Sequence, residues 1–345
     1  MNPDSSEKFK APGFWESLRE AFLGAPRTFA CLQVEVTSRC PARCNYCPHT
    51  TLKDVWQPRD MSLETFGRLW PAMRASARVH LQGWGEPLMN PAFFKMTAIA
   101  RKAGCRVSTT TCGLHLNEEL ARKIVDSGID IIAFSLAGTD AATNEVRRGA
   151  DFEKVCRSIA TLQNIRRARG GVHLEVHFAY LMLASTMESV RTLPALAKEL
   201  GVHAAVVSTL DYIPASGFEK EAFGPHEAEK LAQATGWLKE AEAKARALEV
   251  DFHWSLPSPD APGNECRENV SRCFYIAADG AVSPCVYLNL PVRMEDPGRR
   301  IFGNVNEREV LEIWADERFL AFRKALASGA PDPACKSCPK RFMAG

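Results

Sequence analysis

Short apolar segments alternate with longer amphipathic segments between residues 31 and 209. The short segments are rich in β-branched residues, which is typical of strands, and they lie at Cys31–Thr37, Arg78–Leu81, Cys105–Thr110, Asp130–Ser135, Val172–Tyr180 and His203–Thr209. The longer segments repeat with the period of a helix, and they lie at Met61–Ala75, Pro91–Ala103, Asn117–Ser127, Phe152–Arg167 and Thr186–Leu200. Strands that alternate with helices predict successive βα units around a parallel sheet.

Glycines stand just past three of the predicted helices, at Gly104, Gly128 and Gly201. A left-handed residue, usually glycine, commonly ends a helix at this position. The six predicted strands are fewer than the eight of a closed barrel. The pattern alone therefore leaves two α/β folds open, an incomplete (β/α)6 barrel and a doubly wound sheet.

The chain on either side of these units has a different pattern. Residues 1–30 form an amphipathic lead-in, whose apolar face consists of Phe14, Trp15, Leu18, Ala21, Phe22 and Leu23. A further helix is predicted from about Pro225 to Leu248, and a proline-rich turn follows at Ser255–Gly263. We therefore divide the chain into a lead-in, the α/β unit, a helical connector and a small cysteine-rich domain, with boundaries at 1–30, 31–215, 216–262 and 263–345.

Composition and charge narrow the class of protein. Hydrophobic residues make up 46% and charged residues 24% of the chain, as in ordinary globular proteins. The net charge of +2 and the lack of a long basic run argue against nucleic acid as a partner. The chain has neither an apolar stretch of about 18 residues, as a membrane span needs, nor an apolar secretory segment at its start. We expect a soluble, cytoplasmic protein.

Twelve cysteines are unusual for a protein of that compartment. Disulfide frameworks belong mainly to small secreted domains, so clustered thiols in a reducing cytosol favour metal or iron–sulfur binding. Cys31 and Cys105 begin predicted strands and Cys156 lies in a predicted helix, where a buried apolar role is expected. The other cysteines include three near the N-terminus and five near the C-terminus, and these two groups are the candidate ligands.

The strongest local motif is Cys40-Pro-Ala-Arg-Cys44-Asn-Tyr-Cys47, directly after the first predicted strand. Three thiolates on one short loop can hold three corners of a [4Fe–4S] cluster and leave one iron open to a small molecule. A structural zinc site takes four protein ligands, and only His49 is an obvious fourth ligand here. The spacing therefore favours the cluster over zinc.

This loop resembles the cluster motif of the radical S-adenosylmethionine (radical SAM) enzymes. The resemblance places Tyr46 against the adenine of SAM. The segment Gly83-Trp84-Gly85-Glu86-Pro87, after the second strand, is similar to the family's Gly-Gly-Glu motif, with Trp84 in place of the first glycine. In the family, the backbone of this motif contacts the amino group of the SAM methionine.

Two further positions agree with this family. Ser135 ends the fourth predicted strand, and the resemblance implies that Ser135 and Arg148 help to bind the ribose and carboxylate of SAM. Arg147 is the alternative to Arg148, since either guanidinium offers the fork that suits a carboxylate. Ala137 stands where many relatives carry an aspartate, so any role of that aspartate is absent from this chain.

These motifs follow the carboxyl ends of successive predicted strands. Cys40–Cys47, Gly83–Pro87, Thr110–Gly113 and Ser135 would therefore meet on one rim of a parallel barrel, where such folds bind ligands. Cys112 lies within this rim and is a candidate for the edge of the site. His177 alternates within the fifth predicted strand, and we expect a core histidine with satisfied hydrogen bonds.

The C-terminal cysteines resemble the auxiliary-cluster domain called SPASM, or its shorter twitch form. Full SPASM domains hold two clusters with about seven cysteines, whereas this segment has five, so one auxiliary [4Fe–4S] cluster is expected. The preferred ligands are Cys266, Cys285, Cys335 and Cys338, and Cys273 is an alternative that can replace one of them. Zinc is the competing interpretation of paired cysteines.

The resemblance implies a partial barrel, an open-site [4Fe–4S] cluster, and cleavage of SAM to a 5′-deoxyadenosyl radical that abstracts a substrate hydrogen. It further implies an oxidoreductase or maturase that acts on a peptide or protein and receives electrons from a flavodoxin- or ferredoxin-type donor. A radical SAM dehydrogenase of a small alcohol and a non-enzymatic iron–sulfur or zinc scaffold remain alternatives. Non-radical SAM-dependent methyl transfer is disfavoured, because cysteines stand where its glycine-rich loop would follow the first strand. No catalytic base is identified by the sequence.

Overall fold

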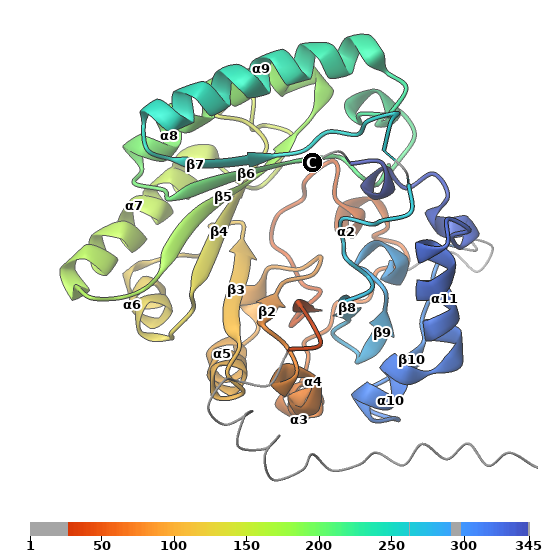
Figure 1. Cartoon of the computed structure of the whole chain (residues 1–345). Helices are drawn as coiled ribbons and strands as arrows, with labels where there is room; N and C mark the ends of the chain where they lie inside the picture. Colours follow the sequence, from red (N-terminus) through yellow and green to blue (C-terminus); the bar gives the residue numbers. More distant parts are fainter. Residues whose placement is uncertain (1–26, 262, 291–297, 344–345) are drawn as a thin grey trace, which may run out of the picture.

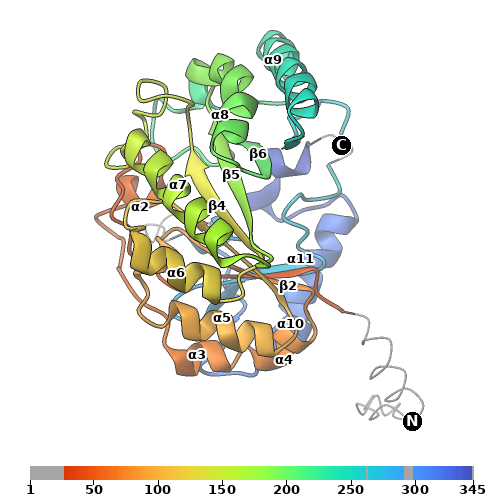
Figure 2. The ribbon, with the colours of Figure 1, turned by 90° about the vertical axis from the view of Figure 1, so that its left-hand side faces the viewer.

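The computed structural model describes residues 27–261, 263–290 and 298–343 and contains one continuous, curved sheet (Figure 1). Ten strands lie in the order β10-β9-β8-β1-β2-β3-β4-β5-β6-β7. Helices α5 to α9 cover the outer face of this sheet, as both views show (Figures 1 and 2). The predicted α/β class is confirmed, and the amphipathic lead-in lies outside the described residues.

Seven neighbouring strands of the sheet run parallel, as successive βα units require. They are β1 (Cys31–Val34), β2 (Arg78–Leu81), β3 (Arg106–Thr111), β4 (Ile131–Leu136), β5 (Glu175–Met182), β6 (Ala204–Thr209) and β7 (Asp251–Trp254). The first six coincide with the predicted strands to within three residues at either end. The seventh was not predicted, because a four-residue strand whose residues are half-buried or exposed has no strong pattern.

The cysteine-rich part continues the same sheet beyond β1. Strand β8 (Cys273–Ile276) pairs parallel with β1, and β9 (Ala281–Ser283) and β10 (Gly303–Asn304) follow in antiparallel order. Helices α10 (Val310–Ala315) and α11 (Glu317–Ala327) pack at this end of the molecule (Figure 1). The barrel part and the C-terminal part therefore share backbone hydrogen bonds along β1.

Most of the remaining helices follow the predicted pattern, but a short helix at residues 48–51 was not predicted and two predicted helices are divided. Their bounds are α2 (Pro48–Thr51), α3 (Leu63–Gly67), α4 (Trp70–Arg74), α5 (Phe93–Lys102), α6 (Glu118–Asp126), α7 (Phe152–Arg169), α8 (Leu193–Glu199) and α9 (Ala228–Ala247). The helices predicted at Met61–Ala75 and Thr186–Leu200 are each divided, the second into a 3-10 segment and α8. Pro71 and Pro194 stand in the first turns of α4 and α8, where a missing N–H is tolerated but a longer helix cannot continue.

Glycines end three helices as predicted, because Gly104, Gly128 and Gly201 all have positive φ, between 66° and 87°. Alternate residues of the inner strands point into the apolar layer under the helices, with Phe134 and Phe178 fully buried. Within the described residues, no helix combines the length and the apolar character of a membrane span.

A buried carboxyl group joins three parts of this sheet just past β1. Glu35 is 5% exposed and accepts hydrogen bonds from the backbone N–H groups of Trp84 (2.9 Å) and Ala278 (3.3 Å). Burial is the main cause that raises the pKa of Glu35 to about 7, although these two N–H groups and the Tyr275 hydroxyl favour the ionised form. The neutral acid is therefore strongly favoured by the fold relative to the unfolded chain.

A buried ion pair joins the end of β6 to the C-terminal part. Lys340 Nζ lies 2.9 Å from Asp211 Oδ2 and 3.5 Å from Glu268 Oε1. Burial alone would lower the pKa of the Lys340 ammonium, but the two carboxylates outweigh it and hold that pKa above its usual value. Removal of the ammonium would leave a 2%-exposed aspartate without its counter-charge.

We predict that Lys340→Met lowers the free energy of unfolding by about 3 kcal/mol, because it breaks one side of a buried ion pair. Lys336→Met is the matched control, since Lys336 is exposed in the same C-terminal segment and its loss should change stability by less than about 0.5 kcal/mol. Urea unfolding under anaerobic conditions measures both. Equal stability of the two variants would contradict the prediction.

We predict that the wild-type chain loses stability relative to Glu35→Gln as the pH rises from about 4.5 to about 7. Below this window the carboxyl group is neutral in both the folded and the unfolded chain. Above it, the group must ionise inside the fold, which costs about 3 kcal/mol for the raised pKa of Glu35. The difference between the unfolding free energies of the wild type and Glu35→Gln should therefore change across this pH range. A difference that stays constant with pH would refute the raised pKa of Glu35.

Candidate functional site

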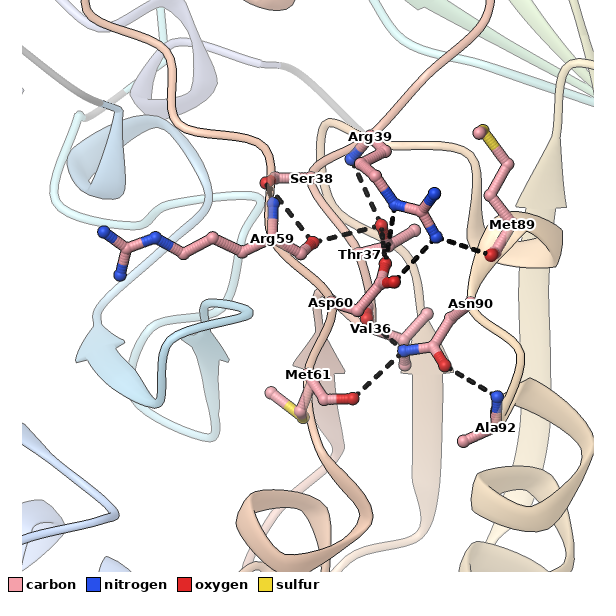
Figure 3. A network of polar contacts seen from close by, with 10 residues as sticks. All are labelled: Val36, Thr37, Ser38, Arg39, Arg59, Asp60, Met61, Met89, Asn90 and Ala92. Carbon is pink, nitrogen blue, oxygen red and sulfur yellow. Dashed lines mark hydrogen bonds and ion pairs between the residues drawn. The ribbon is translucent and has the colours of Figure 1, made fainter.

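The segment that leads from β1 into the cysteine loop is clamped by polar contacts (Figure 3). Asn90 Nδ2 donates to the carbonyls of Val36 (2.6 Å) and Met61 (3.1 Å). Arg39 donates through Nε and Nη2 to the two carboxylate oxygens of Asp60, at 3.0 and 2.6 Å. These contacts fix the backbone immediately before Cys40.

The cysteine loop itself is tied to the segment that carries the two candidate arginines. The N–H of Arg43 donates to the carbonyl of Arg148 (2.7 Å), and the N–H of Asn45 donates to the carbonyl of Val146 (3.0 Å). The N–H of Cys47 donates to the carbonyl of Cys44 (3.1 Å), which closes a tight turn. The thiols lie among apolar neighbours, namely Ala42, Tyr46, Leu114 and Ala150.

The three thiols fit an iron–sulfur cluster by their chemistry. They form an all-sulfur donor set on one loop, with an apolar surround that suits a cluster. Within the described residues, no three potential ligands converge closely enough to hold a single metal ion. Burial raises the pKa of Cys47 to about 12, so a metal that binds this thiolate must displace a proton. Cys112 is also part of the site, since it packs in the same buried group as Cys44 and Cys40.

The loop after β2 packs closely against the start of the cysteine loop. A Cβ on Gly85 would lie 2.1 Å from the carbonyl oxygen of Thr37, so only glycine fits. Glu86 is 3% exposed, and its carboxylate accepts hydrogen bonds from Thr111 Oγ1 (2.8 Å) and from the N–H of Cys112 (2.6 Å). The carboxylate thus holds the loop against the end of β3.

The structure places Arg147, rather than Arg148, in the site. Arg147 is 3% exposed and donates to the carbonyl of Ser135, whereas Arg148 is exposed. The Nε of Arg147 is buried without a hydrogen-bond partner among the described residues. The Arg147 guanidinium lies close to Tyr46 and Cys44. A buried, unpaired donor beside the loop fits an anionic group such as the SAM carboxylate.

Four of the five C-terminal cysteines lie together. Burial is the main cause that raises the pKa values of all members of this group, which are Cys266, Cys285, Cys335 and Cys338, and neighbouring thiols add to this effect at the first three. Cys273 lies in β8, where it pairs in register with Cys31 of β1 and lines one cavity together with Cys285. The donor set of the four fits one four-cysteine cluster, and Cys273 stays the alternative ligand.

Three residues near these groups were not singled out by the sequence, namely Glu35, Asp211 and Lys340. Glu35 and Asp211 each lie just past the carboxyl end of a strand. This position in the sequence could have marked them as candidates for the site. Their buried partners are far away in sequence and cannot be read from it. His177 has a partner as expected, because its Nε2 lies 2.9 Å from Glu175 Oε2.

Two family models match the chain. The model of the radical SAM superfamily matches residues 34–193, and that of an iron–sulfur cluster-binding domain, SPASM, matches residues 266–339. The chain is 25% identical over 332 residues to the tungsten-containing aldehyde ferredoxin oxidoreductase cofactor-modifying protein of Pyrococcus furiosus, with 90% of this chain and 87% of that protein covered. It is also 25% identical over 333 residues to the PqqA peptide cyclase of Streptomyces rochei, with 92% and 83% covered.

Solved structures share the fold. SuiB of Streptococcus suis bound to S-adenosylmethionine superposes with a TM-score of 0.66 at 14% identity, over 91% of this chain and 72% of that one. The enzyme anSMEcpe with bound AdoMet gives 0.63 at 17% identity, over 86% and 84%. The matched domains imply a [4Fe–4S] cluster, an auxiliary cluster and SAM as cofactors. The chain therefore belongs to the radical SAM superfamily and is a radical SAM enzyme with a C-terminal SPASM-type domain.

Proposed function

We propose that this enzyme is a maturase that modifies a peptide or protein substrate. The observation that carries the proposal is a cavity of about 700 Å³ between the end of β6 and the C-terminal part, whose lining includes Leu210, Asp211, Tyr287 and Cys338. The cavity is large enough for part of a peptide and lies beside one of the four clustered cysteines. PqqA peptide cyclases are among the relatives, and SuiB with its precursor peptide and anSMEcpe with a peptide share the fold.

The residues that hold the cofactors follow from the site. Cys40, Cys44 and Cys47 would bind the first cluster, and the four clustered C-terminal cysteines would bind the auxiliary cluster. Tyr46, the Gly83–Glu86 backbone, Ser135 and Arg147 would bind SAM. Together these cofactors supply the reductive cleavage of SAM and the abstraction of a substrate hydrogen atom.

The protein contributes orientation and exclusion of water. The fork of Arg147 would hold the carboxylate of SAM, and the carboxylate of Glu86 keeps the adjacent loop in place through Thr111. Apolar residues around the cysteine loop keep water from the reacting centre. A flavodoxin- or ferredoxin-type protein would deliver the electron, and Cys266, Cys285, Cys335 and Cys338 would hold a second redox-active group beside the cavity that Cys338 lines.

The substrate class is tested by fractionating a cell extract by size and adding each fraction to the reduced enzyme and SAM. A peptide substrate should stimulate SAM cleavage in a fraction that loses its effect after protease treatment, and the peptide mass should change. Stimulation that resides in a protease-resistant small-molecule fraction would instead establish the small-alcohol dehydrogenase.

We predict that the triple variant Cys40→Ala, Cys44→Ala, Cys47→Ala lowers the iron content from about eight to about four per chain and abolishes SAM cleavage, because each [4Fe–4S] cluster carries four irons. Iron and sulfide analysis of anaerobically prepared protein measures this. A wild-type content of about four that falls to none would leave the auxiliary site to zinc or free thiols. Stoichiometric zinc in place of iron, without SAM cleavage, would refute the assignment of the chain as a radical SAM enzyme.

We predict that Arg147→Ala weakens SAM binding at least tenfold, whereas Arg148→Ala changes it less than twofold. The reason is that a charge-assisted contact from a buried guanidinium is worth about 1.5–3 kcal/mol, whereas Arg148 is exposed. Equilibrium binding of SAM, with iron content as the control for loop integrity, distinguishes the two. The reverse order of effects would restore Arg148 as the carboxylate ligand.

A further inference from the structure

Trp84 replaces a glycine of the family motif, and its side chain contacts the C-terminal part of the molecule. Its indole Nε1 donates to the carbonyl of Val286 at 3.3 Å. Its ring meets the ring of Tyr287 edge to face, with centroids 5.7 Å apart. Val286 and Tyr287 directly follow Cys285, one of the proposed auxiliary ligands. One residue of the SAM loop thus contacts the backbone next to the second cluster site.

The backbone of Trp84 is held to the same part of the molecule by a second contact. Its N–H donates to Glu35 Oε1 at 2.9 Å, while Oε2 of Glu35 accepts from the N–H of Ala278 at 3.3 Å. Ala278 lies in the turn between β8 and β9. The carboxyl group of Glu35 therefore bridges the SAM loop and the hairpin that leads to Cys285.

The space between these parts leaves little freedom. A Cβ on Gly83 would lie 2.5 Å from the Cβ of Glu35, and a Cβ on Gly85 would lie 2.1 Å from a backbone oxygen. The glycines on either side of Trp84 therefore allow the loop to lie directly against the segment that follows β1. The indole ring packs against a buried group of residues, which are Tyr275, Ala277, Ala281 and Val286. A movement of the loop must be accompanied by movement of the C-terminal part.

We propose that Trp84, with Glu35, is a positioning residue that couples SAM binding to the auxiliary cluster. The inference rests on the proposed function, since it requires SAM at the Gly83–Glu86 loop and a cluster at Cys285. Contact of the SAM amino group with the loop stabilises one position of the indole and of the Val286 carbonyl. That carbonyl dipole and the adjacent thiolate set the environment of the cluster, and hydrogen bonds and dipoles near a cluster tune its potential.

Such coupling is reciprocal. A ligand that shifts the reduction potential of a cluster must itself bind with different affinities to the forms of the protein with the cluster oxidised and reduced. S-adenosylhomocysteine is a suitable probe, since it carries the amino and carboxylate groups of SAM but lacks the sulfonium centre that is cleaved. Its affinity is measured for the holoenzyme with the auxiliary cluster oxidised and with it reduced, while electron paramagnetic resonance reports the cluster directly.

In the wild-type enzyme we expect the two affinities to differ at least threefold and the auxiliary-cluster signal to shift on binding. Trp84→Phe keeps a ring but removes the indole donor, so it should reduce the difference. Trp84→Gly removes both contacts of the side chain and should abolish it, and Glu35→Gln weakens the second contact. Trp254→Phe, on the distant strand β7, is the matched control and should retain the wild-type difference.

Iron content and melting temperature of each variant show that both clusters and the fold are retained. Equal affinities in the wild-type enzyme, or a wild-type difference that persists in both Trp84 variants, would overturn the coupling and leave the proposed function intact. A wild-type holoenzyme that binds neither SAM nor the probe would instead overturn the proposed function.

Discussion

The pairing of β1 with β8 is the interaction on which the rest of the molecule depends. Four residues of β1 pair in register with four of β8, from Cys31 opposite Cys273 to Val34 opposite Ile276. The cysteine loop leaves the end of β1, and the hairpin that precedes Cys285 leaves the end of β8. Because one backbone ladder sets both exits, the two cluster sites are positioned by the same hydrogen bonds, and Glu35 extends the link one residue beyond the ladder.

The parts of the fold with a strong local signal could be predicted from the sequence. Strand β2 was predicted at its observed bounds, and the spacing of Cys40, Cys44 and Cys47 is itself a local property of one loop. The sequence favoured Arg148 over Arg147, and the exposure of Arg148 could not be foreseen, because a one-residue difference on an irregular loop has no periodicity. The burial of Glu35 and the pairing of Cys273 with Cys31 depend on partners far away in sequence, which only the folded chain brings near.

Three buried or half-buried ionisable groups lie at boundaries between parts of the molecule. Glu35 lies between β1 and the β8–β9 hairpin, Lys340 lies between β6 and the C-terminus, and Arg147 lies between β4 and the cysteine loop. A polar contact between parts depends on direction, whereas apolar packing tolerates small sliding movements. These groups therefore specify how the parts dock, while the aliphatic and aromatic side chains under the helices supply most of the favourable free energy.

The unpaired Nε of Arg147 has a consequence for the lifetime of the protein in a cell. A buried donor without an acceptor costs about 1–3 kcal/mol, and a ligand that supplies the acceptor returns this free energy to the folded state. If SAM supplies this acceptor, as proposed above, the chain without SAM opens more often, and proteolysis that acts on transiently opened chains would remove it preferentially. The supply of the cofactor would in this way regulate how much of the enzyme persists, in addition to how fast each molecule works.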